Sequence, residues 1–179
     1  MSGRPAMDRL TDILARLDRL AGAALDAAVI GLAGLLLVLL NWAVFARFIL
    51  NDSVSWGEEL PAHILATLTF IGAAYLTRSN EHLGFDAVLR VLPARAMRVV
   101  TAMNLLLMGG FGALLAWYGG IAAESFAGRS LISVDLPMVL FRAAMPLGGA
   151  LIAAFCLVRF AGVVTGRVDP ETLLPEADA

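Results

Sequence analysis

Two histidines and one cysteine are the side chains of this sequence best suited to binding a metal or a haem. The stretch from Leu60 to Thr77 has the length of a membrane span, so His63 near its start and His82 beyond its end should lie at opposite boundaries. They could not share one ion there, and the sequence has no C-x-x-C pair to support a site. Cys156 lies in an apolar block and is expected to pack. The sequence predicts no cofactor and no metal.

Two adjacent carboxylates precede the same stretch and could make ionic contacts. Ser55 and Glu58 have the S-x-x-E spacing of a capping box, in which serine caps a helix and glutamate bonds back to the backbone. On that interpretation Glu59 is left to pair with Arg47, at the end of the preceding uncharged block. Pro61 removes one helical hydrogen bond, so we expect either a kink or a later helix start.

Arg142 is a charged side chain inside an otherwise apolar block, residues 136–158. Its side chain could extend to the outer boundary of the membrane. Alternatively, it could pair with Glu58, with Glu59 or with a carboxylate of another subunit, because an unpaired charge in lipid is costly. The residues leave both possibilities open.

The expected middle of the membrane has few polar side chains, and none of them is charged. They are Asn41, Thr67, Thr69 and Asn104. A chain that moves ions or an anionic solute by itself normally needs intramembrane charges, and many such chains have an internal repeat.

Nothing resembles a nucleophile with its base or a phosphate-binding glycine loop, so we expect no enzyme. Glycine pairs such as Gly148-Gly149 are expected to permit close helix contact.

The composition shows which elements hold these residues. Of 179 residues, 60 % are apolar and 16 % are charged, which is too apolar for a soluble domain of this size. The net charge of −2 includes no basic excess, so nucleic acid is not an expected partner. We predict a single all-α domain in contact with membrane lipids, with four transmembrane helices at 25–50, 56–77, 97–123 and 136–159.

Two further segments are expected to be amphipathic helices lying in the plane of the membrane. Residues 6–20 and 84–93 both place apolar residues three and four apart, with charged residues between them. The tail, residues 166–179, contains prolines and several acidic residues, so we expect it to be solvated.

The distribution of arginine predicts the orientation. Ten of the thirteen basic residues, all of them arginine, fall on the side of the two termini, and three fall on the other side. Because positive charge accumulates on the cytoplasmic side, both termini should be cytoplasmic. An even number of spans agrees with this assignment.

A series of short motifs runs from Arg47 to Asp86. It comprises Arg47-Phe-x-x-Asn51, Trp56-x-Glu58-Glu59-Leu60, Phe70-x-Gly72-Ala-Ala-Tyr75, Arg78 and His82-x-x-x-Asp86, and it is followed later by Leu92-Pro93 and Pro146-Leu-Gly148. In order and spacing it resembles the small membrane subunit of tripartite ATP-independent periplasmic (TRAP) transporters, the DctQ-like family.

The resemblance implies a multi-pass protein of the bacterial inner membrane and two protein partners. One is a large permease subunit that carries a solute using a sodium gradient, and the other is a periplasmic solute-binding protein that delivers the solute, usually an organic acid. The small subunit would act as a scaffold, with the motif residues in structural or subunit-contact roles. Arg142 is a further candidate for subunit contact.

The main alternative is a membrane-anchor subunit of a respiratory or redox complex. Such a subunit also uses a few spans and little chemistry of its own. It would require axial histidine or methionine ligands in facing spans, which would give the purified protein a characteristic absorbance spectrum.

Overall fold

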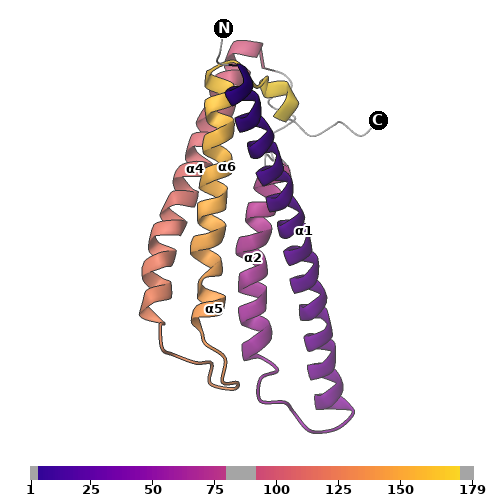
Figure 1. The fold of residues 1–179 in the computed structure, drawn as a ribbon. Coiled ribbons are helices and arrows are strands. Elements are labelled where there is room, and N and C mark those ends of the chain that lie inside the picture. The colour runs from indigo at the N-terminus through magenta and orange to yellow at the C-terminus, as the bar shows by residue number, and fades with distance from the viewer. Residues whose placement is uncertain (1–3, 80–91, 174–179) are drawn as a thin grey trace, which may run out of the picture.

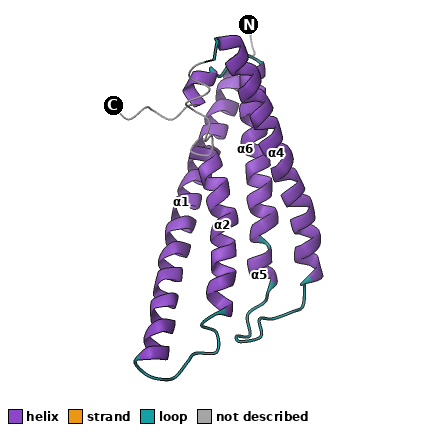
Figure 2. Ribbon diagram, turned by 180° about the vertical axis from the view of Figure 1, so that it is seen from behind, coloured by secondary structure: helices purple, strands orange, loops and turns teal. Residues whose placement is uncertain are grey.

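The structure is a computed structural model that describes residues 4–79 and 92–173, and this part of the chain is helical apart from its connections and one isolated bridge between Ser130 and Pro137 (Figures 1 and 2). The elements are α1 (Arg4–Phe48), α2 (Glu59–Ser79), α4 (Ala94–Ser125), α5 (Val139–Arg142), α6 (Ala144–Val164) and the 3-10 helix η1 (Pro170–Leu173). The predicted all-α class is confirmed.

The long helices form an open row in the order α1, α2, α6, α4. Each contacts its neighbour in that order, and the contact between α6 and α4 is the most extensive. Figure 1 shows the row spreading toward the end that carries the α1–α2 and α4–α5 connections, which we call the loop end. The start of α1 and η1 lie together at the opposite end, the terminal end. An open row leaves more helix surface uncovered than a closed four-helix bundle does.

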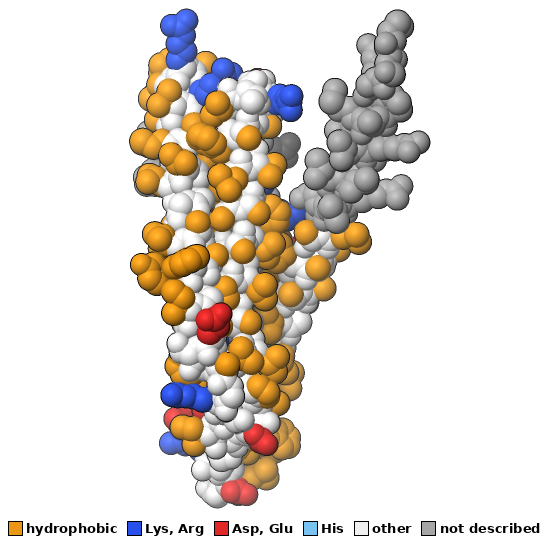
Figure 3. All heavy atoms as spheres, turned by 60° about the vertical axis from the view of Figure 1, so that its left-hand side comes forward, with side chains coloured by type: hydrophobic (Ala, Val, Ile, Leu, Met, Phe, Trp, Pro, Cys, Tyr) orange, Lys and Arg blue, Asp and Glu red, His pale blue; other side chains and the backbone are white. Residues whose placement is uncertain are grey.

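Four helical segments are long and apolar enough to cross a membrane. They are Arg19–Phe48, Glu59–Ser79, Ala94–Ser125 and Val139–Val164. These segments coincide with the four predicted spans, with boundaries that shift by a few residues. Figure 3 shows hydrophobic side chains over the middle of the molecule and charged side chains concentrated toward its two ends, as expected of a membrane-spanning protein.

The predicted amphipathic segment 6–20 and the first span are parts of one continuous helix, α1. The sequence between them is rich in alanine and contains no proline, so nothing ends the helix there. The in-plane placement of residues 6–20 stays a prediction. The predicted helix 84–93 lies almost entirely outside the described residues, apart from its last two positions.

The tail differs from expectation in its first part. Gly166 adopts a φ of 69°, which reverses the chain after α6 and lets Val168 N–H donate to Gly162 O at 3.1 Å. Leu173 in η1 is only 6 % exposed. This leucine packs against the terminal end, and removal of its apolar side chain from water stabilises η1 in that position.

Glycines allow the backbones of the central helices to approach closely. A Cβ atom at Gly149 of α6 would stand 2.6 Å from Ala116 N of α4, and one at Gly148 would stand 2.6 Å from Phe70 O of α2. The two adjacent glycines therefore face different neighbours. The expectation that this pair permits close helix contact is confirmed.

Two prolines determine where the helices at the loop end are interrupted. Leu60 N–H donates to Trp56 O and Ala62 N–H to Glu58 O, but Pro61 between them has no N–H for the Gly57 carbonyl. Helix α2 consequently begins at Glu59, the later start considered from the sequence. Pro146 has the same effect in the neighbouring helix: it has no N–H for the Arg142 carbonyl, and α5 ends at Arg142 while α6 begins at Ala144.

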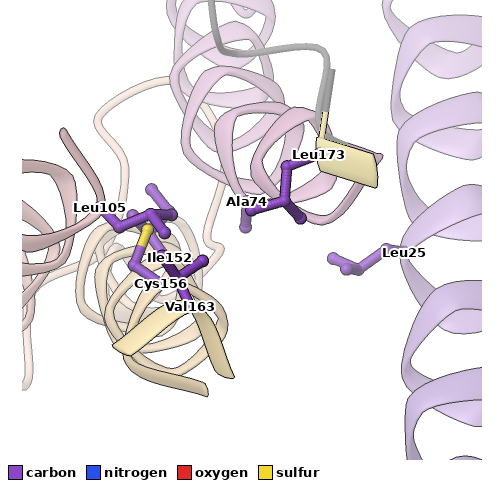
Figure 4. Packing of buried hydrophobic residues seen from close by; sticks show 7 residues of the cluster. All are labelled: Leu25, Ala74, Leu105, Ile152, Cys156, Val163 and Leu173. Carbon is purple, nitrogen blue, oxygen red and sulfur yellow. The ribbon is translucent and has the colours of Figure 1, made fainter. Parts of the chain in front are cut away.

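The buried core lies toward the terminal end of the row. One cluster joins the helices and η1 (Figure 4); its buried members are Leu25, Ala74, Leu105, Ile152, Cys156, Val163 and Leu173. Cys156 is fully buried there, as expected of a packing residue. In contrast, large apolar side chains on α1 and α4 are exposed, among them Trp42, Phe48 and Trp117. A lipid or protein surface must cover them.

Candidate functional site

The connection between α4 and α5 forms a short hairpin at the loop end. Leu131 N–H donates to Leu136 O at 3.0 Å, and Met138 N–H donates to Arg129 O at 2.9 Å. We call residues 129–138 the loop-end hairpin. The tip of this hairpin is exposed, as the 96 % exposure of the Ile132 side chain shows.

The carboxylate of Glu59 fastens this hairpin to the start of α2. Ile132 N–H donates to one carboxylate oxygen at 3.0 Å, and Ser133 N–H donates to the other at 2.7 Å. The Ser133 hydroxyl donates to the same oxygen as its own amide. Hydrogen bonds to a charged acceptor are stronger than neutral ones. One side chain thus links the start of α2 firmly to a hairpin about 74 residues later in the sequence.

The contacts of Glu58 and Glu59 differ from those predicted. Arg47 lies 3.9 Å from Glu58, in a pair whose side chains are 65 % and 95 % exposed, and Glu59 binds the hairpin instead of Arg47. The capping box of Ser55 and Glu58 is wrong, because α2 begins only at Glu59. The pattern S-x-x-E places Glu58 in a third helical position that the chain does not form.

Asn51 ends the turn after α1 in a conformation that few residues adopt. Its φ is 51°, in the left-handed region, where asparagine is tolerated better than most residues. This conformation lets Asp52 N–H donate to Ala46 O at 3.1 Å and close the end of α1. Trp56 accepts a bond from Leu60 N–H at 3.2 Å and is partly buried. Both motif residues therefore shape the α1–α2 connection.

Arg142 lies at the end of α5 with its guanidinium carbon 4.4 Å from the centre of the Phe126 ring. This is a cation–π contact at short range. Within the described part of the chain it has no carboxylate partner, so of the alternatives considered from the sequence, pairing with Glu58 or Glu59 is wrong. The two glutamates are instead directed to Arg47 and to the hairpin.

A second group of contacts lies at the terminal end. The guanidinium of Arg159 on α6 donates to the carbonyl oxygens of Thr77 and Arg78, at the end of α2. A cation at this position interacts favourably with the helix dipole of α2. The guanidinium of Arg78 in turn lies over Gly22 of α1, where a Cβ atom would overlap it.

Sequence reasoning missed the role of Arg159. The available signal was its position, since it follows the last apolar block at the same end as Arg78. That position does not identify the carbonyl groups that it binds. The motif residues His82 and Asp86 lie outside the described residues.

His63 is held by its own helix and by α5. Its Nδ1–H donates to Glu59 O, because a carbonyl can only accept, and the two atoms are 2.9 Å apart. Its ring meets Phe141 edge-on, with 5.5 Å between the ring centres. Among the residues described, no three histidine, cysteine, aspartate or glutamate side chains cluster as metal ligands.

Three of the four polar side chains expected at membrane depth are bound to their own helices. Thr67 donates to His63 O at 2.9 Å, Thr69 to Leu65 O at 2.8 Å, and the Asn41 amide to Leu37 O at 2.7 Å. Such bonds satisfy a hydroxyl or amide hydrogen locally. Together with the contacts at the two ends, these bonds fix the helices in place. In the described residues they do not form a continuous series of polar groups across the row.

Comparison with known proteins places these features in a family. The family model described as "Tripartite ATP-independent periplasmic transporters, DctQ component" matches residues 36–166. The small permease protein SiaQ of a sialic acid TRAP transporter from Vibrio cholerae is 25 % identical, over 64 % of this chain and 66 % of that protein. The small permease protein DctQ of a C4-dicarboxylate TRAP transporter from the same organism is 23 % identical, over 74 % and 68 % respectively.

The family match covers α2, α4, α5 and α6 completely, together with the last part of α1. They name transporter subunits, so the chain is no enzyme, and the redox-anchor alternative is not favoured. The family and the four membrane-spanning helices place the chain in the inner membrane as a multi-pass protein. The chain belongs to the DctQ family, the small membrane component of tripartite ATP-independent periplasmic transporters.

Proposed function

We propose that this chain is a static scaffold that holds a large TRAP permease subunit in the membrane. A sodium gradient would drive uptake through that subunit, and a periplasmic solute-binding protein would deliver the solute. The names of the two relatives contain sialic acid and C4-dicarboxylate, which are organic acids, so we propose an organic acid for this complex as well.

The open row of helices is the observation that carries the proposal. Helices α1 and α4 at its two edges contact only one long helix extensively, and both expose large apolar side chains. A row offers a broad apolar surface to a second membrane protein, whereas a closed bundle would bury much of that surface in itself. The surface is held in shape by the glycine contacts of α6 and by the fastened ends.

The chemistry of the described residues supports a scaffold and not a carrier. Thr67, Thr69 and Asn41 are bonded to their own helices, and ionisable contacts lie at the ends. A carrier for an anionic solute needs polar or charged groups that become available at membrane depth. We therefore assign solute and sodium binding to the large subunit.

The loop-end residues Arg47 and Glu59 are proposed to support assembly in different ways. Arg47 is 65 % exposed and paired only at 3.9 Å, so its guanidinium is available to a carboxylate of a partner. Glu59 acts indirectly by positioning the loop-end hairpin, whose tip carries the exposed Ile132. Both residues lie at a boundary where a partner and water meet.

The test is co-expression of the chain with the large permease subunit encoded nearest to it. We expect Arg47→Ala and Glu59→Ala to lower the amount of co-purified large subunit and to lower solute uptake in proportion. Glu124→Ala, which removes an exposed charge from the same end but outside the loop-end hairpin, is the control and should retain both. Normal complex yield together with lost uptake would contradict the scaffold role and indicate direct participation in transport.

A further inference from the structure

A hollow of about 230 Å³ lies between α2, α4, α5 and α6 near the loop end. Its apolar wall includes Ala66, Phe70, Ala122 and Phe141, and its polar lining comes from His63 and Arg142. We call it the Arg142 hollow.

The hollow is elongated along α2 and has different chemistry at its two ends. From His63 to Phe70 the helix rises by about 10 Å. His63 is one turn from the start of α2, and Arg142 is three residues from the start of α5, so both mark the boundary end. The deep end is closed where Phe70 meets Gly148 of α6. A cation therefore lies at the boundary, and an apolar channel extends from it toward the middle of the membrane.

The guanidinium of Arg142 has hydrogen-bonding capacity left for a ligand. Its described contact is the face of the Phe126 ring, which accepts no conventional hydrogen bond, and no described carboxylate pairs with it. The planar fork of a guanidinium suits two oxygens of one phosphate or carboxylate. The His63 ring is oriented by its bond to Glu59 O, which leaves the other ring nitrogen unused by that bond.

These features match the chemistry of a phospholipid. A lipid carries its phosphate at the membrane boundary and its acyl chain toward the middle, in the same order as the cation and the apolar channel. Basic pockets between transmembrane helices on the cytoplasmic side bind anionic head groups, and a guanidinium at the opposite boundary offers a phosphate the same contact. A small soluble anion would gain the cation but would leave the apolar wall uncovered. In a zwitterionic lipid the phosphate already has an internal cation, so the guanidinium favours a lipid with net negative charge.

We propose that the Arg142 hollow binds one anionic phospholipid, with its phosphate on Arg142 and part of an acyl chain between α2 and α5. The proposal does not rest on the scaffold role, because the site is formed by this chain alone. A bound lipid would occupy the space between α2 and α5 and would satisfy the charge of Arg142 within the membrane.

The test is native mass spectrometry of the full chain in detergent, titrated with dioleoylphosphatidylglycerol or with dioleoylphosphatidylcholine. We expect one phosphatidylglycerol to bind the unmodified chain preferentially. Arg142→Gln should weaken this binding about tenfold, the loss of one charge-assisted contact, while Arg142→Lys should retain part of it. Arg129→Gln is the matched control, because Arg129 also lies against the Phe126 ring, at 5.5 Å, but does not line the hollow.

A second variant tests the apolar part of the site without changing its charge. Ala66→Phe places a ring in the channel and should reduce phosphatidylglycerol binding about as much as Arg142→Gln does. Thermal unfolding of each variant in detergent checks that the chain is folded.

Equal binding by the unmodified chain, Arg142→Gln and Ala66→Phe would overturn the proposal, as would equal binding of the two lipids. If Arg142→Gln leaves lipid binding unchanged but reduces co-purification of the large subunit, Arg142 contacts a carboxylate of the partner, and the lipid site is refuted. Unchanged lipid binding together with unchanged co-purification refutes it as well. Failure of the scaffold role would appear only in co-purification and uptake, so the two proposals are distinguishable.

Discussion

The close contact of α4 with α6 predicts a large difference between two glycines on the same helix. Gly112 is buried, and a Cβ atom there would stand 2.8 Å from Ala153 N and 2.9 Å from Gly149 O. Gly110, two residues earlier, is exposed and has nothing within 4 Å of the same position. Comparing alanine variants at these two positions therefore separates the cost of the close helix contact from the effect of alanine on helix propensity.

The magnitude follows from these distances. A Cβ atom in ordinary van der Waals contact stands 3.4–4 Å from its neighbours, so Gly112→Ala must push two backbones apart by roughly 0.5–1.2 Å. Overpacking of this kind costs about 1–3 kcal/mol. The gain in helix propensity from glycine to alanine, about 1 kcal/mol, applies to both variants and cancels in their comparison. We expect the free energy of unfolding to be about 1–3 kcal/mol lower for Gly112→Ala than for Gly110→Ala.

The assay is reversible unfolding of the purified chain, titrated from a mild detergent into sodium dodecyl sulfate and followed by tryptophan fluorescence. Circular dichroism before the titration checks that both variants are helical. If the two variants unfold with free energies within about 0.5 kcal/mol of each other, the reasoning is refuted, because a difference that small is typical of surface substitutions. A lower stability of Gly110→Ala would place the close contact on the other face of α4.

Two further predictions concern the ends of the row. Glu59→Gln should speed amide hydrogen exchange at the tip of the loop-end hairpin at least severalfold, because a neutral amide is a weaker acceptor for the three donors than a carboxylate is. Glu58→Gln should leave that exchange unchanged. Equal exchange in both variants would contradict the assigned contacts. Arg159→Gln should speed exchange at the terminal-end turn of α2 relative to Arg167→Gln, because Arg159 donates to the carbonyls there and the Arg167 side chain makes no such bond among the described residues. Equal exchange in the two variants would show that the Arg159 contacts do not stabilise this turn.

The fold was largely predictable because the membrane imposes a simple rule on sequence. A span requires about twenty apolar residues, so the uncharged blocks identified α1, α2, α4 and the combined α5–α6 segment. Close helix contact at Gly148 and Gly149 was predictable for a similar reason, since small residues permit it. The order of the helices in the row was not predictable, because apolar blocks do not specify which faces meet.

The contacts of the loop end were harder to predict because they join distant segments. A capping box is a local pattern, and at Ser55 and Glu58 it competes with Pro61, which delays the helix start. The partner of Glu59 lies in a hairpin that no local pattern links to it. Arg159 binds backbone carbonyls, which every residue possesses, so its partners at the end of α2 leave no trace in the sequence.

Asn51 illustrates the part of the motif that has a physical explanation within the chain itself. Its left-handed φ of 51° explains why asparagine suits the turn after α1. The exposed pair of Arg47 and Glu58 has no comparable explanation within the chain, because an exposed pair at 3.9 Å contributes little to stability. This is a reason for our proposal that Arg47 contacts a partner.

Solute accumulation in reconstituted vesicles tests the scaffold role most directly. The chain alone, the large permease subunit alone and the two together would each be reconstituted with the binding protein and a carboxylate solute under an imposed sodium gradient. The account predicts accumulation by the two subunits together and none by this chain alone. Gradient-driven accumulation by this chain alone would contradict it, because the described residues would then have to carry the solute themselves.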